Sequence, residues 1–446
     1  MSFKTVLLSL FLLVLLESCS VFSPFSERED FIRVRGIHFI HNDKPYYYAG
    51  TNLWYGCYLG SPGSTGDRPR LLRELDSLCA SGFTNLRVMA ASEDSYLSRS
   101  VRPAIQRAPG VLDDSLMRGL DYLLSEMAKR KMHAVLYLNN YWQWSGGMAA
   151  YNVWADGGKG ADPDNPAEGY GKFMNFSATF YTNPKATALF RNFVKTVVTR
   201  ENSVNGRPYA GDPTIMAWQL ANEPRPGTDS QEGRQNVDAF CSWIDQTAEY
   251  IHSLDTNHLV STGSEGTVGS LGSSDYFLRS HQTKQIDYLT FHIWPFNWGW
   301  YDPRRIDETL PTAIEKVKKY IHNHQLLARQ MNKPIVLEEF GIPRDSGNYA
   351  WSSPTTARDR YYATVLEVLY DSARAGAPVA GSNFWGWGGH ARGQHPDFVW
   401  RTGDPFVGDP PQEPQGRNSI FITDTSTLSI LRGHAFQMMR LGLAGE

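Results

Sequence analysis

The sequence predicts a (β/α)8 TIM barrel that forms a single catalytic domain. Short apolar runs of strand length recur eight times between residues 46 and 383, and most are separated by stretches with helical spacing. After residue 31 the chain shows no repeat, no low-complexity linker and no block of like charge. Eight alternating units in one stretch of roughly 400 residues favour a closed barrel over an open sheet.

The strands and helices can be placed in chain order. Residues 31–48 predict a hairpin that turns at Asn42-Asp43 and closes the barrel floor. Helical spacing is clearest at residues 117–127 and 314–321, and the fifth unit is the weakest because residues 266–285 offer only a short helical patch. The eight expected strands are residues 46–51, 84–89, 134–138, 215–220, 259–261, 288–291, 335–337 and 379–383.

The first 30 residues predict export rather than a folded element. Lys4 supplies a positive charge, residues 6–16 form an apolar run too short to span a bilayer as a mature helix, and Leu16-Glu17-Ser18-Cys19 resembles a bacterial lipoprotein cleavage box. We therefore expect a signal peptide at residues 1–18, a lipidated Cys19, a tether at 19–30 and the catalytic domain at 31–446. Glu17 departs from the usual small residue, so plain secretion is the alternative. The expected location is the bacterial cell envelope, at the outer membrane or cell surface, with the lipid anchor as the sole membrane contact.

Composition excludes several classes of function. The 43 Lys and Arg against 46 Asp and Glu give a net charge of −3, which argues against a nucleic-acid partner. The 12 His show no paired ligand spacing, and the carboxylates at residues 162–168 are interrupted by two prolines, so neither a metal nor another cofactor is expected. The mature chain would keep Cys57, Cys79 and Cys241, an odd number that leaves at least one thiol free.

Polar side chains follow several of the expected strands, where barrels carry their chemistry. Two carboxylates stand out: Glu223 after the fourth strand, and Glu338 or Glu339 after the seventh. Strands four and seven face each other across an eight-stranded barrel, which permits a carboxyl pair about 5 to 5.5 Å apart, as in retaining glycosidases. The other polar residues at these strand ends are Asn52, Arg87, Asn139, Asn140, Asn222 and His292.

Tryptophans support a sugar substrate. Nine of the 13 fall in three loops that would surround the barrel mouth, whereas a core would scatter them through strands and helices. Indole rings offer apolar area to the C–H faces of sugars, although loop packing without a ligand would also explain them. The nine are Trp142, Trp144 and Trp154 after strand three, Trp294, Trp298 and Trp300 after strand six, and Trp385, Trp387 and Trp400 after strand eight.

These residues carry a family resemblance over nearly all of the mature chain. The ordered set of Asn52, Arg87, residues 222–224, His292, residues 339–341 and Trp385 resembles glycoside hydrolase family 5, a group of retaining (β/α)8 enzymes. Residues 139–147 and 222–225 are similar to subfamily 7, whose members are mostly endo-β-1,4-mannanases. One departure is Trp294, which stands where many members carry a Tyr two residues after the histidine.

The resemblance implies a role for each residue. Glu223 would be the general acid/base with a raised pKa, and Glu339 the nucleophile, kept ionised by Arg87. Glu338 is the rival nucleophile, and adjacent strand residues are expected to point to opposite faces. Asn222 would hold the sugar 2-hydroxyl, His292 and Trp294 would orient the carboxylates, Trp385 would lie under the reacting sugar, and Arg225 would contact the leaving-group sugar. Trp142 and Trp54 complete the expected substrate contacts; a packing or ion-pair role is the alternative for each of these secondary residues.

The sequence therefore predicts a mannan endo-1,4-β-mannosidase. It would cleave internal β-1,4 bonds of mannan, galactomannan or glucomannan with retention, using two glutamates and no cofactor. Within the same family, an exo-acting β-mannosidase is the alternative if residues 141–181 wall off one end of the cleft, and a β-1,4-glucanase is another. Outside enzymes, the alternative is a surface glycan-binding lipoprotein that uses the same aromatic residues without turnover.

Overall fold

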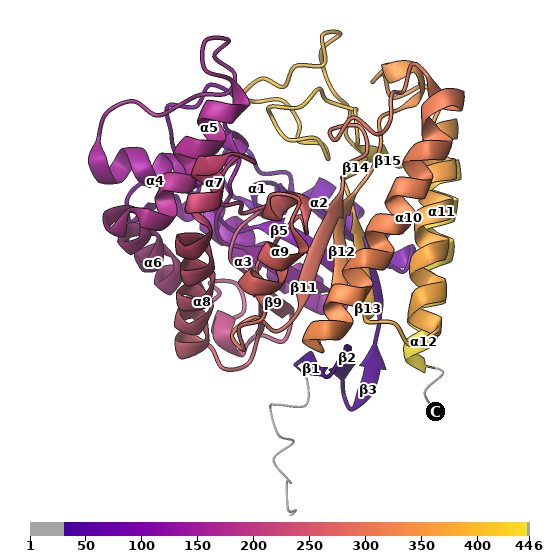
Figure 1. Cartoon of the computed structure of the whole chain (residues 1–446), viewed down its shortest axis with the longest axis horizontal. Helices are drawn as coiled ribbons and strands as arrows, with labels where there is room; N and C mark the ends of the chain where they lie inside the picture. The colour runs from indigo at the N-terminus through magenta and orange to yellow at the C-terminus, as the bar shows by residue number, and fades with distance from the viewer. Residues whose placement is uncertain (1–30, 444–446) are drawn as a thin grey trace, which may run out of the picture.

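The computed structural model describes residues 31–443, which form the expected (β/α)8 barrel (Figure 1). Eight parallel strands lie side by side in the order β10-β9-β8-β5-β4-β13-β12-β11. All their residues except the partly exposed His133 are buried, as expected for parallel strands covered by helices. In chain order they are β4 (Tyr48–Asn52), β5 (Asn85–Met89), β8 (His133–Tyr137), β9 (Ile215–Gln219), β10 (Leu259–Ser261), β11 (Leu289–Ile293), β12 (Ile335–Phe340) and β13 (Val379–Phe384).

The barrel closes between β10 and β11 through scattered hydrogen bonds rather than a regular ladder. The Asp287 amide donates to the Val260 carbonyl at 2.9 Å, and the His292 amide donates to the Glu265 carbonyl at 3.2 Å. The second of these bonds lies near the carboxyl ends of the strands, where the polar residues gather. The closure therefore ties the fifth unit directly to the site.

Helices surround the barrel, and several begin after a residue whose side chain caps the free amides of the first turn. Asp113 accepts a hydrogen bond from the Leu116 amide, and Asn183 accepts from the amides of Lys185 and Ala186 ahead of a helix that starts with Pro184. The helices are α1 (Gly56–Gly60), α2 (Arg68–Ala80), α3 (Asp114–Lys129), α4 (Gly147–Asp156), α5 (Gly169–Ala178), α6 (Pro184–Val198), α7 (Gln231–Gln235), α8 (Val237–Leu254), α9 (Ser274–His281), α10 (Ile306–Met331), α11 (Thr356–Arg374) and α12 (Thr425–Leu443).

The units differ in length as predicted. The fifth contributes only the eight-residue α9. Much longer excursions follow β8, which carries α4 and α5 before α6, and β13, which is followed by residues 385–424 and the short strands β14 (Trp387–Gly389) and β15 (Ile420–Phe421). Another two-stranded ribbon, β6 (Gln106–Ala108) with β7 (Val111–Leu112), follows β5. In Figure 1 the long excursions rise at the top of the barrel, opposite β1 to β3.

The N-terminal hairpin is confirmed, with one more strand than expected. β2 (His38–His41) pairs antiparallel with β3 (Lys44–Tyr46), and the turn residues Asn42 and Asp43 have φ of 50° and 60°, as a type I′ hairpin requires. β1 (Arg33–Arg35) adds to the other edge of β2. Phe39 packs with Tyr48, Tyr288 and other inward residues of the strands in one apolar cluster, which closes the barrel floor.

A local irregularity in β12 decides how the site is built. Phe291 of β11 pairs with Leu337, but the next residue, His292, pairs with Glu339, so Glu338 is an extra residue in the ladder. Such a bulge turns consecutive side chains toward the same side of a strand. Glu338 and Glu339 therefore do not alternate between faces, contrary to the expectation from a regular strand.

The signal peptide, lipidated Cys19 and tether all lie outside the described residues. Within residues 31–443 no helix combines the length and the apolar character that crossing a bilayer requires. Cys57, Cys79 and Cys241 are free thiols.

Candidate active site

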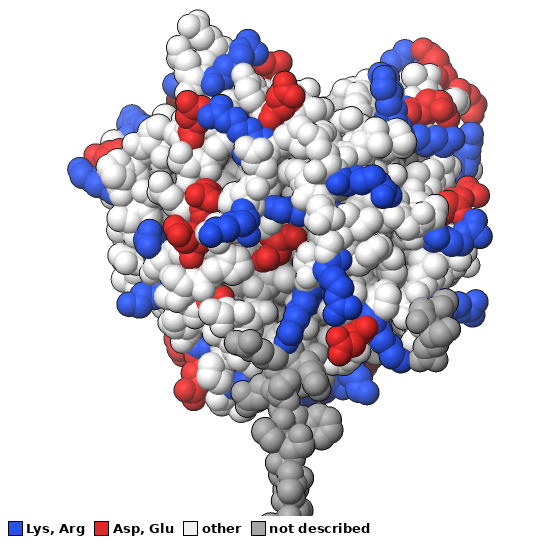
Figure 2. Space-filling model, turned by 60° about the horizontal axis from the view of Figure 1, so that its bottom comes forward, with Lys and Arg blue, Asp and Glu red and all other residues white. Residues whose placement is uncertain are grey.

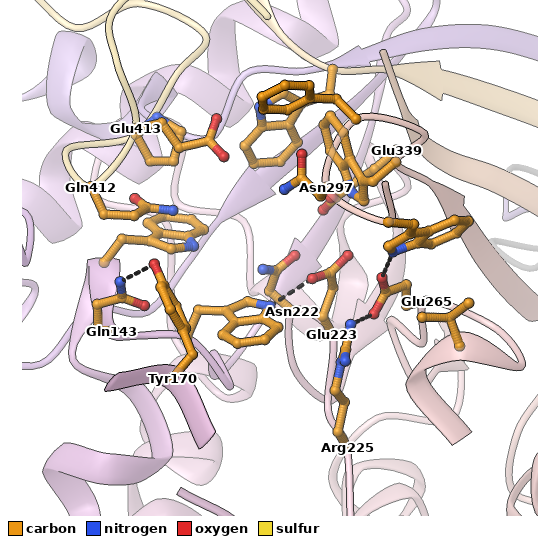
Figure 3. A pocket seen from close by; sticks show the side chains of 18 of the residues that line it. Gln143, Tyr170, Asn222, Glu223, Arg225, Glu265, Asn297, Glu339, Gln412 and Glu413 are labelled. Carbon is orange, nitrogen blue, oxygen red and sulfur yellow. Dashed lines mark hydrogen bonds and ion pairs between the residues drawn. The ribbon is translucent and has the colours of Figure 1, made fainter. Parts of the chain in front are cut away.

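A cavity of about 500 Å³ opens at the carboxyl ends of the barrel strands (Figure 3). Glu223 follows β9 and Glu339 lies near the end of β12, and the side chains of both line this cavity. Most of the predicted contact residues join them there. The predicted contacts that line the cavity are Asn222, Arg225, Trp142, Trp294 and Trp385, and Trp144 and Trp298 line it as well. Arg87 and His292 are fully buried and are not part of the cavity lining.

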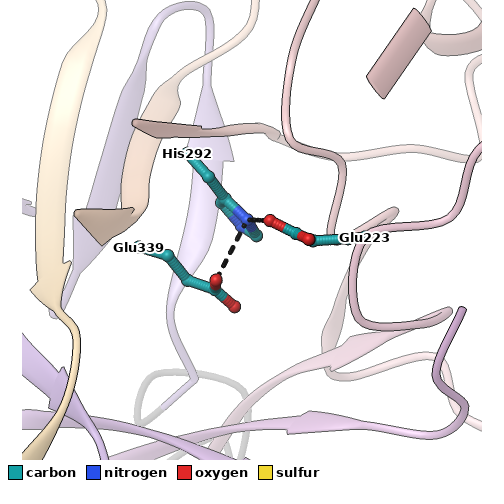
Figure 4. Close-up of side chains that lie close together, drawn as sticks. All are labelled: Glu223, His292 and Glu339. Carbon is teal, nitrogen blue, oxygen red and sulfur yellow. Dashed lines mark hydrogen bonds and ion pairs between the residues drawn. The ribbon is translucent and has the colours of Figure 1, made fainter. Parts of the chain in front are cut away.

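The two glutamates meet at His292 (Figure 4). Nδ1 of His292 lies 2.7 Å from Oε1 of Glu223 and 3.4 Å from Oε2 of Glu339. One carboxylate oxygen of each glutamate lies within 4.8 Å of the other. Burial and the nearby Arg87 hold the pKa of His292 well below its ordinary value, so the ring is neutral. Because Nδ1 is the ring nitrogen with hydrogen-bond partners, we assign the single ring proton to it.

Glu223 is held by backbone geometry as well as by its side-chain partners. Its φ of 49° lies in the left-handed region, which is uncommon outside glycine and occurs often in functional sites. Its amide donates to the Gly263 carbonyl at 2.9 Å, and its Oε2 accepts a 2.6 Å hydrogen bond from the Trp142 indole. Burial raises the pKa of Glu223, while Arg225 and the Trp142 donor oppose the rise. The carboxyl group is therefore biased toward its protonated form.

Glu339 is paired with a buried arginine. Arg87, from β5, is fully buried; its Nη1 donates to Glu339, and its Nη2 donates to Oδ1 of Asn222 at 2.8 Å. Burial and the charge of Glu223 raise the pKa of Glu339, and the Arg87 guanidinium opposes that rise. Two buried carboxylates this close cannot both be charged at low cost, so the pair holds one proton near neutrality. Because Arg87 contacts Glu339 directly, its positive charge favours the ionised form of Glu339, and we infer that the shared proton lies on Glu223.

Glu338 lies beneath the site rather than on the outer face of the barrel. Its Oε2 accepts from Nε2 of Gln219 at 2.7 Å and lies 3.5 Å from Nε of Arg87. Its side chain is fully buried and does not line the cavity. The expectation that Glu338 would point away from Glu339 is wrong because of the bulge. Glu339 lines the cavity and Glu338 does not, while the role of Glu339 as nucleophile stays a prediction.

The three ligand atoms of Glu223, His292 and Glu339 could also meet a cation. Arg87 already pairs with Glu339, and the Trp142 N–H already donates to Glu223. A fixed positive charge and a donated hydrogen would compete with a divalent ion for the same oxygens. The donor set therefore suits proton transfer better than metal binding.

The tryptophans divide into cavity-lining and supporting residues. Trp294 and Trp385 pack edge to face, with ring centroids 5.9 Å apart, and both border the cavity. Trp54 does not line it: the ring is 1% exposed, donates to the Gly408 carbonyl and packs against Trp144 from behind. The predicted substrate contact at Trp54 is therefore replaced by a supporting role. Trp154, Trp300, Trp387 and Trp400 also lie outside the cavity wall.

Several cavity residues escaped prediction. Glu265, which follows β10, is buried, forms an ion pair with Arg225 and accepts from the Trp298 indole at 2.9 Å. The position of Glu265, four residues after the short fifth strand, is the sequence feature from which its place in the cavity could have been predicted. A second group comes from the long excursions: Gln143 and Tyr170, joined by a 2.8 Å hydrogen bond, and Gln412, Glu413 and Arg417 from the segment after β13. Gln143 lies within residues 139–147, which carry part of the family resemblance, whereas no sequence pattern marks the other four.

One unpredicted residue supports the tryptophan loop from outside the cavity. Glu93 is fully buried; its amide donates to the Ser145 carbonyl at 2.7 Å, and its Oε2 accepts from the Gly147 amide at 2.8 Å. A Cβ on Gly146 would lie 2.3 Å from the Glu93 carbonyl oxygen, so this close approach requires glycine. Burial raises the pKa of Glu93 to about 8. Glu93 thus fixes the turn that carries Trp142 and Trp144.

Comparison with known proteins gives consistent matches over most of the chain. A family model described as GH family 5 beta-mannosidase-like matches residues 29–442. Mannan endo-1,4-beta-mannosidase 1 of Oryza sativa subsp. japonica is 30% identical over 371 residues, covering 80% of this chain and 78% of the relative. The crystal structure of a glycoside hydrolase family 5 mannosidase from Rhizomucor miehei has a TM-score of 0.86 and 36% identity, covering 94% of this chain and 100% of that one. A glutamate-to-alanine variant of that mannosidase, at 35% identity and a TM-score of 0.85 over 94% of this chain and 99% of that one, was solved in complex with mannosyl-fructose.

Proposed function

Because the chain belongs to the GH family 5 beta-mannosidase-like family and is therefore a glycosidase, we propose that it hydrolyses β-1,4-mannosidic bonds with retention of configuration. The proposed substrates are mannan, galactomannan and glucomannan, the first suggested by the name of the rice relative. The observation that carries the mechanism is the approach of Glu223 and Glu339 to within 4.8 Å. Inverting enzymes separate their carboxyl groups by about 6.5 to 9.5 Å to admit a water molecule, whereas retaining enzymes bring them closer.

In the first step Glu223 acts as the acid and Glu339 as the nucleophile. The carboxylate of Glu339 attacks the anomeric carbon while the bond from that carbon to the glycosidic oxygen breaks, and the proton of Glu223 passes to that oxygen. Arg87 holds Glu339 ionised before attack. The Asn222 amide, bound to Arg87 and lining the cavity, binds the sugar 2-hydroxyl in this proposal, as the family resemblance implies. The products are a glycosyl ester on Glu339 and a free leaving-group sugar.

In the second step Glu223 acts as the base. Now ionised, it removes a proton from a water molecule, whose oxygen attacks the anomeric carbon and displaces Glu339. The nearby Trp142 N–H and the His292 Nδ1–H stabilise the carboxylate form of Glu223 between the two steps. Water takes its place beside the anomeric carbon of the ester after the leaving-group sugar has left the cavity.

The place of cleavage is a second question, and one observation favours the exo-acting alternative. In Figure 3, Gln143, Tyr170 and Gln412 stand on the side of the cavity away from Arg225 and Glu265. The hydrogen bond between Gln143 and Tyr170 joins part of this wall. If Arg225 contacts the leaving group, as the family resemblance implies, the wall meets the non-reducing end of the substrate. Such a wall would limit the enzyme to terminal mannose units, while the rice relative is named for endo action.

Two measurements test these proposals. Proton NMR of the first product formed from a mannooligosaccharide should show the β-anomer before mutarotation; an initial α-anomer would exclude double displacement. Chromatography of mannohexaose digests separates the two places of cleavage. A ladder of short oligomers means endo action, and mannose with mannopentaose as the first products means exo action. Cellohexaose serves as the control for the β-1,4-glucanase alternative.

For localisation, we propose export and lipid anchoring at Cys19. Support comes from the apolar run at residues 6–16 and the Leu16–Cys19 sequence. Mass spectrometry of the protein purified from membranes should find an acylated Cys19 as the first residue. A first residue other than Cys19, in a protein recovered from the medium, would favour plain secretion.

A further inference from the structure

The barrel floor carries a charge opposite in sign to that of the chain as a whole. The protein has a net charge of −3, yet exposed Lys and Arg residues recur in the segments that precede the strands. Figure 2 shows Lys and Arg side chains gathered on this face, around the point where the described chain begins. The exposed acidic residues in these segments include Asp43, which lies 3.4 Å from Arg35, Glu201, and Asp371, which lies 3.1 Å from Arg374. The exposed cations are Arg33, Arg35, Lys44, Lys131, Arg207, Lys284 and Arg329.

Exposed apolar side chains lie beside these cations. Phe436, Met439 and Leu443, on α12, are 41%, 38% and 60% exposed. The end of α12 reaches β3, where a Cβ on Gly442 would lie 2.8 Å from the Pro45 carbonyl oxygen. Met439 and Leu443 line a hollow of about 730 Å³ together with Lys44, Lys131 and Arg207. Large apolar residues seldom stand exposed in a group on a surface that stays in water.

The position at which the chain enters the barrel indicates that a membrane contacts this face. The described residues begin at Phe31 and enter β1 on the floor, while the catalytic cavity opens at the opposite end of the barrel. From Cys19 to Phe31 is 12 residues, which span at most about 40 Å when extended. An anchor at Cys19 would therefore hold the floor close to a bilayer. Basic residues interleaved with apolar ones match the headgroup region of an anionic bilayer.

We propose that the floor of the barrel, defined by the seven cations above with Met439 and Leu443, docks on a membrane surface that contains anionic phospholipid. The cations lie over the phosphate groups, and the apolar side chains of α12 enter the headgroup layer. The catalytic mouth then faces away from the bilayer, toward the polymer. This contact is independent of the glycosidase mechanism and adds to the acyl anchor proposed at Cys19 by holding the floor of the barrel against the bilayer.

Residues 20–446, which keep every described residue but lack Cys19 and the signal peptide, allow the test without acylation. Their binding is measured by co-sedimentation with vesicles of phosphatidylglycerol and phosphatidylcholine, and with vesicles of phosphatidylcholine alone, at 50 and 500 mM NaCl. We expect binding to the anionic vesicles at low salt and its loss at high salt, where the Debye length shortens to about 4 Å. No binding to anionic vesicles at 50 mM NaCl would overturn the proposal.

Matched variants separate docking from general charge. Lys131→Glu with Arg207→Glu should weaken vesicle binding at least tenfold, and Met439→Ser with Leu443→Ser should weaken it severalfold. The control is Lys172→Glu with Arg304→Glu, which makes the same charge change at exposed positions near the mouth. Equal loss in the control would overturn the proposal, as would concentration-dependent self-association that the floor variants abolish, which would assign the face to a second copy. Every variant should keep its activity on a soluble aryl β-mannoside. Absence of that activity in the parent protein would contradict the proposed function and leave the vesicle result standing.

Discussion

The indole nitrogen of Trp142 donates a 2.6 Å hydrogen bond to Oε2 of Glu223, across 81 residues of sequence. The bond ties the loop after β8 to the proposed acid/base on the loop after β9. A hydrogen bond donated to a carboxylate stabilises its charged form and lowers its pKa. Trp142 therefore acts on both the position and the proton affinity of Glu223.

Trp142→Phe keeps an aromatic ring and removes the N–H. The pKa of Glu223 should rise, so the fall in activity on the alkaline side should move to higher pH, and kcat should drop about tenfold because the base form is less stabilised in the second step. Trp154→Phe is the matched control, since Trp154 belongs to the same excursion and packs on Tyr151 away from the cavity. The pH profile of kcat/KM checks this. An unshifted alkaline limb would show that the hydrogen bond has no effect on catalysis.

Glu339→Ala should lower kcat by at least about a thousandfold while binding of mannooligosaccharide, followed by calorimetry, persists. The reason is the loss of the attacking carboxylate from a cavity that is otherwise intact. Glu338→Gln is the matched control: it keeps the size of the side chain and an oxygen for Gln219. We expect a far smaller loss for this variant. A near-wild-type rate for Glu339→Ala, or the larger loss for Glu338→Gln, would reverse the assignment.

Activity should fall as pH rises past neutrality. Burial raises the pKa of Glu223, and the acid must be protonated when it meets the glycosidic oxygen, so the active fraction declines as pH passes through that pKa. Glu223→Gln should remove this alkaline limb. The Glu223→Gln variant should lose least activity on an aryl mannoside with a good leaving group, because the departure of that group needs no acid in the first step. A wild-type rate that stays constant to strongly alkaline pH would count against Glu223 as the acid.

Glu93 offers a prediction about stability. Burial raises its pKa to about 8, so the folded protein keeps a proton on Glu93 that the unfolded chain releases near its ordinary value of 4.5. The stability from this group is complete at pH values below 4.5 and is lost progressively as pH rises toward 8. Glu93→Gln, which is neutral at every pH, should match the wild type at pH 5 and melt higher at pH 9, by on the order of 2 °C. If the difference in melting temperature between the wild type and Glu93→Gln is the same at pH 5 and at pH 9, Glu93 is not protonated in the folded protein.

The barrel and the paired acids follow from features that a sequence displays directly. Strand-length apolar runs recur in order, and Glu223 and His292 stand at strand ends where burial of a polar group is expensive. The outcome is the eight-stranded barrel and, as Figure 4 shows, Glu223 and Glu339 both facing His292. The spacing of apolar and polar residues predicts these features because it depends only on positions close together in the sequence.

What the sequence could not supply depends on contacts between distant segments. The extra residue at Glu338 comes from the register between β11 and β12, which no single strand encodes. In the sequence Trp54 follows a strand, as the cavity-lining tryptophans do, but in the structure the Trp144 ring packs against Trp54 on the cavity side. Glu413 and Arg417 reach the cavity because the segment after β13 folds back over the mouth, and irregular loops carry no periodic signal of their path.

The apolar plug of Phe39, Tyr48 and Tyr288 has a kinetic consequence. This cluster closes the base of the barrel and the cavity lies at the opposite end, so arriving substrate and departing sugar use the same opening. Released mannose or short oligomers will therefore compete with fresh polymer for entry, and turnover will slow as they accumulate.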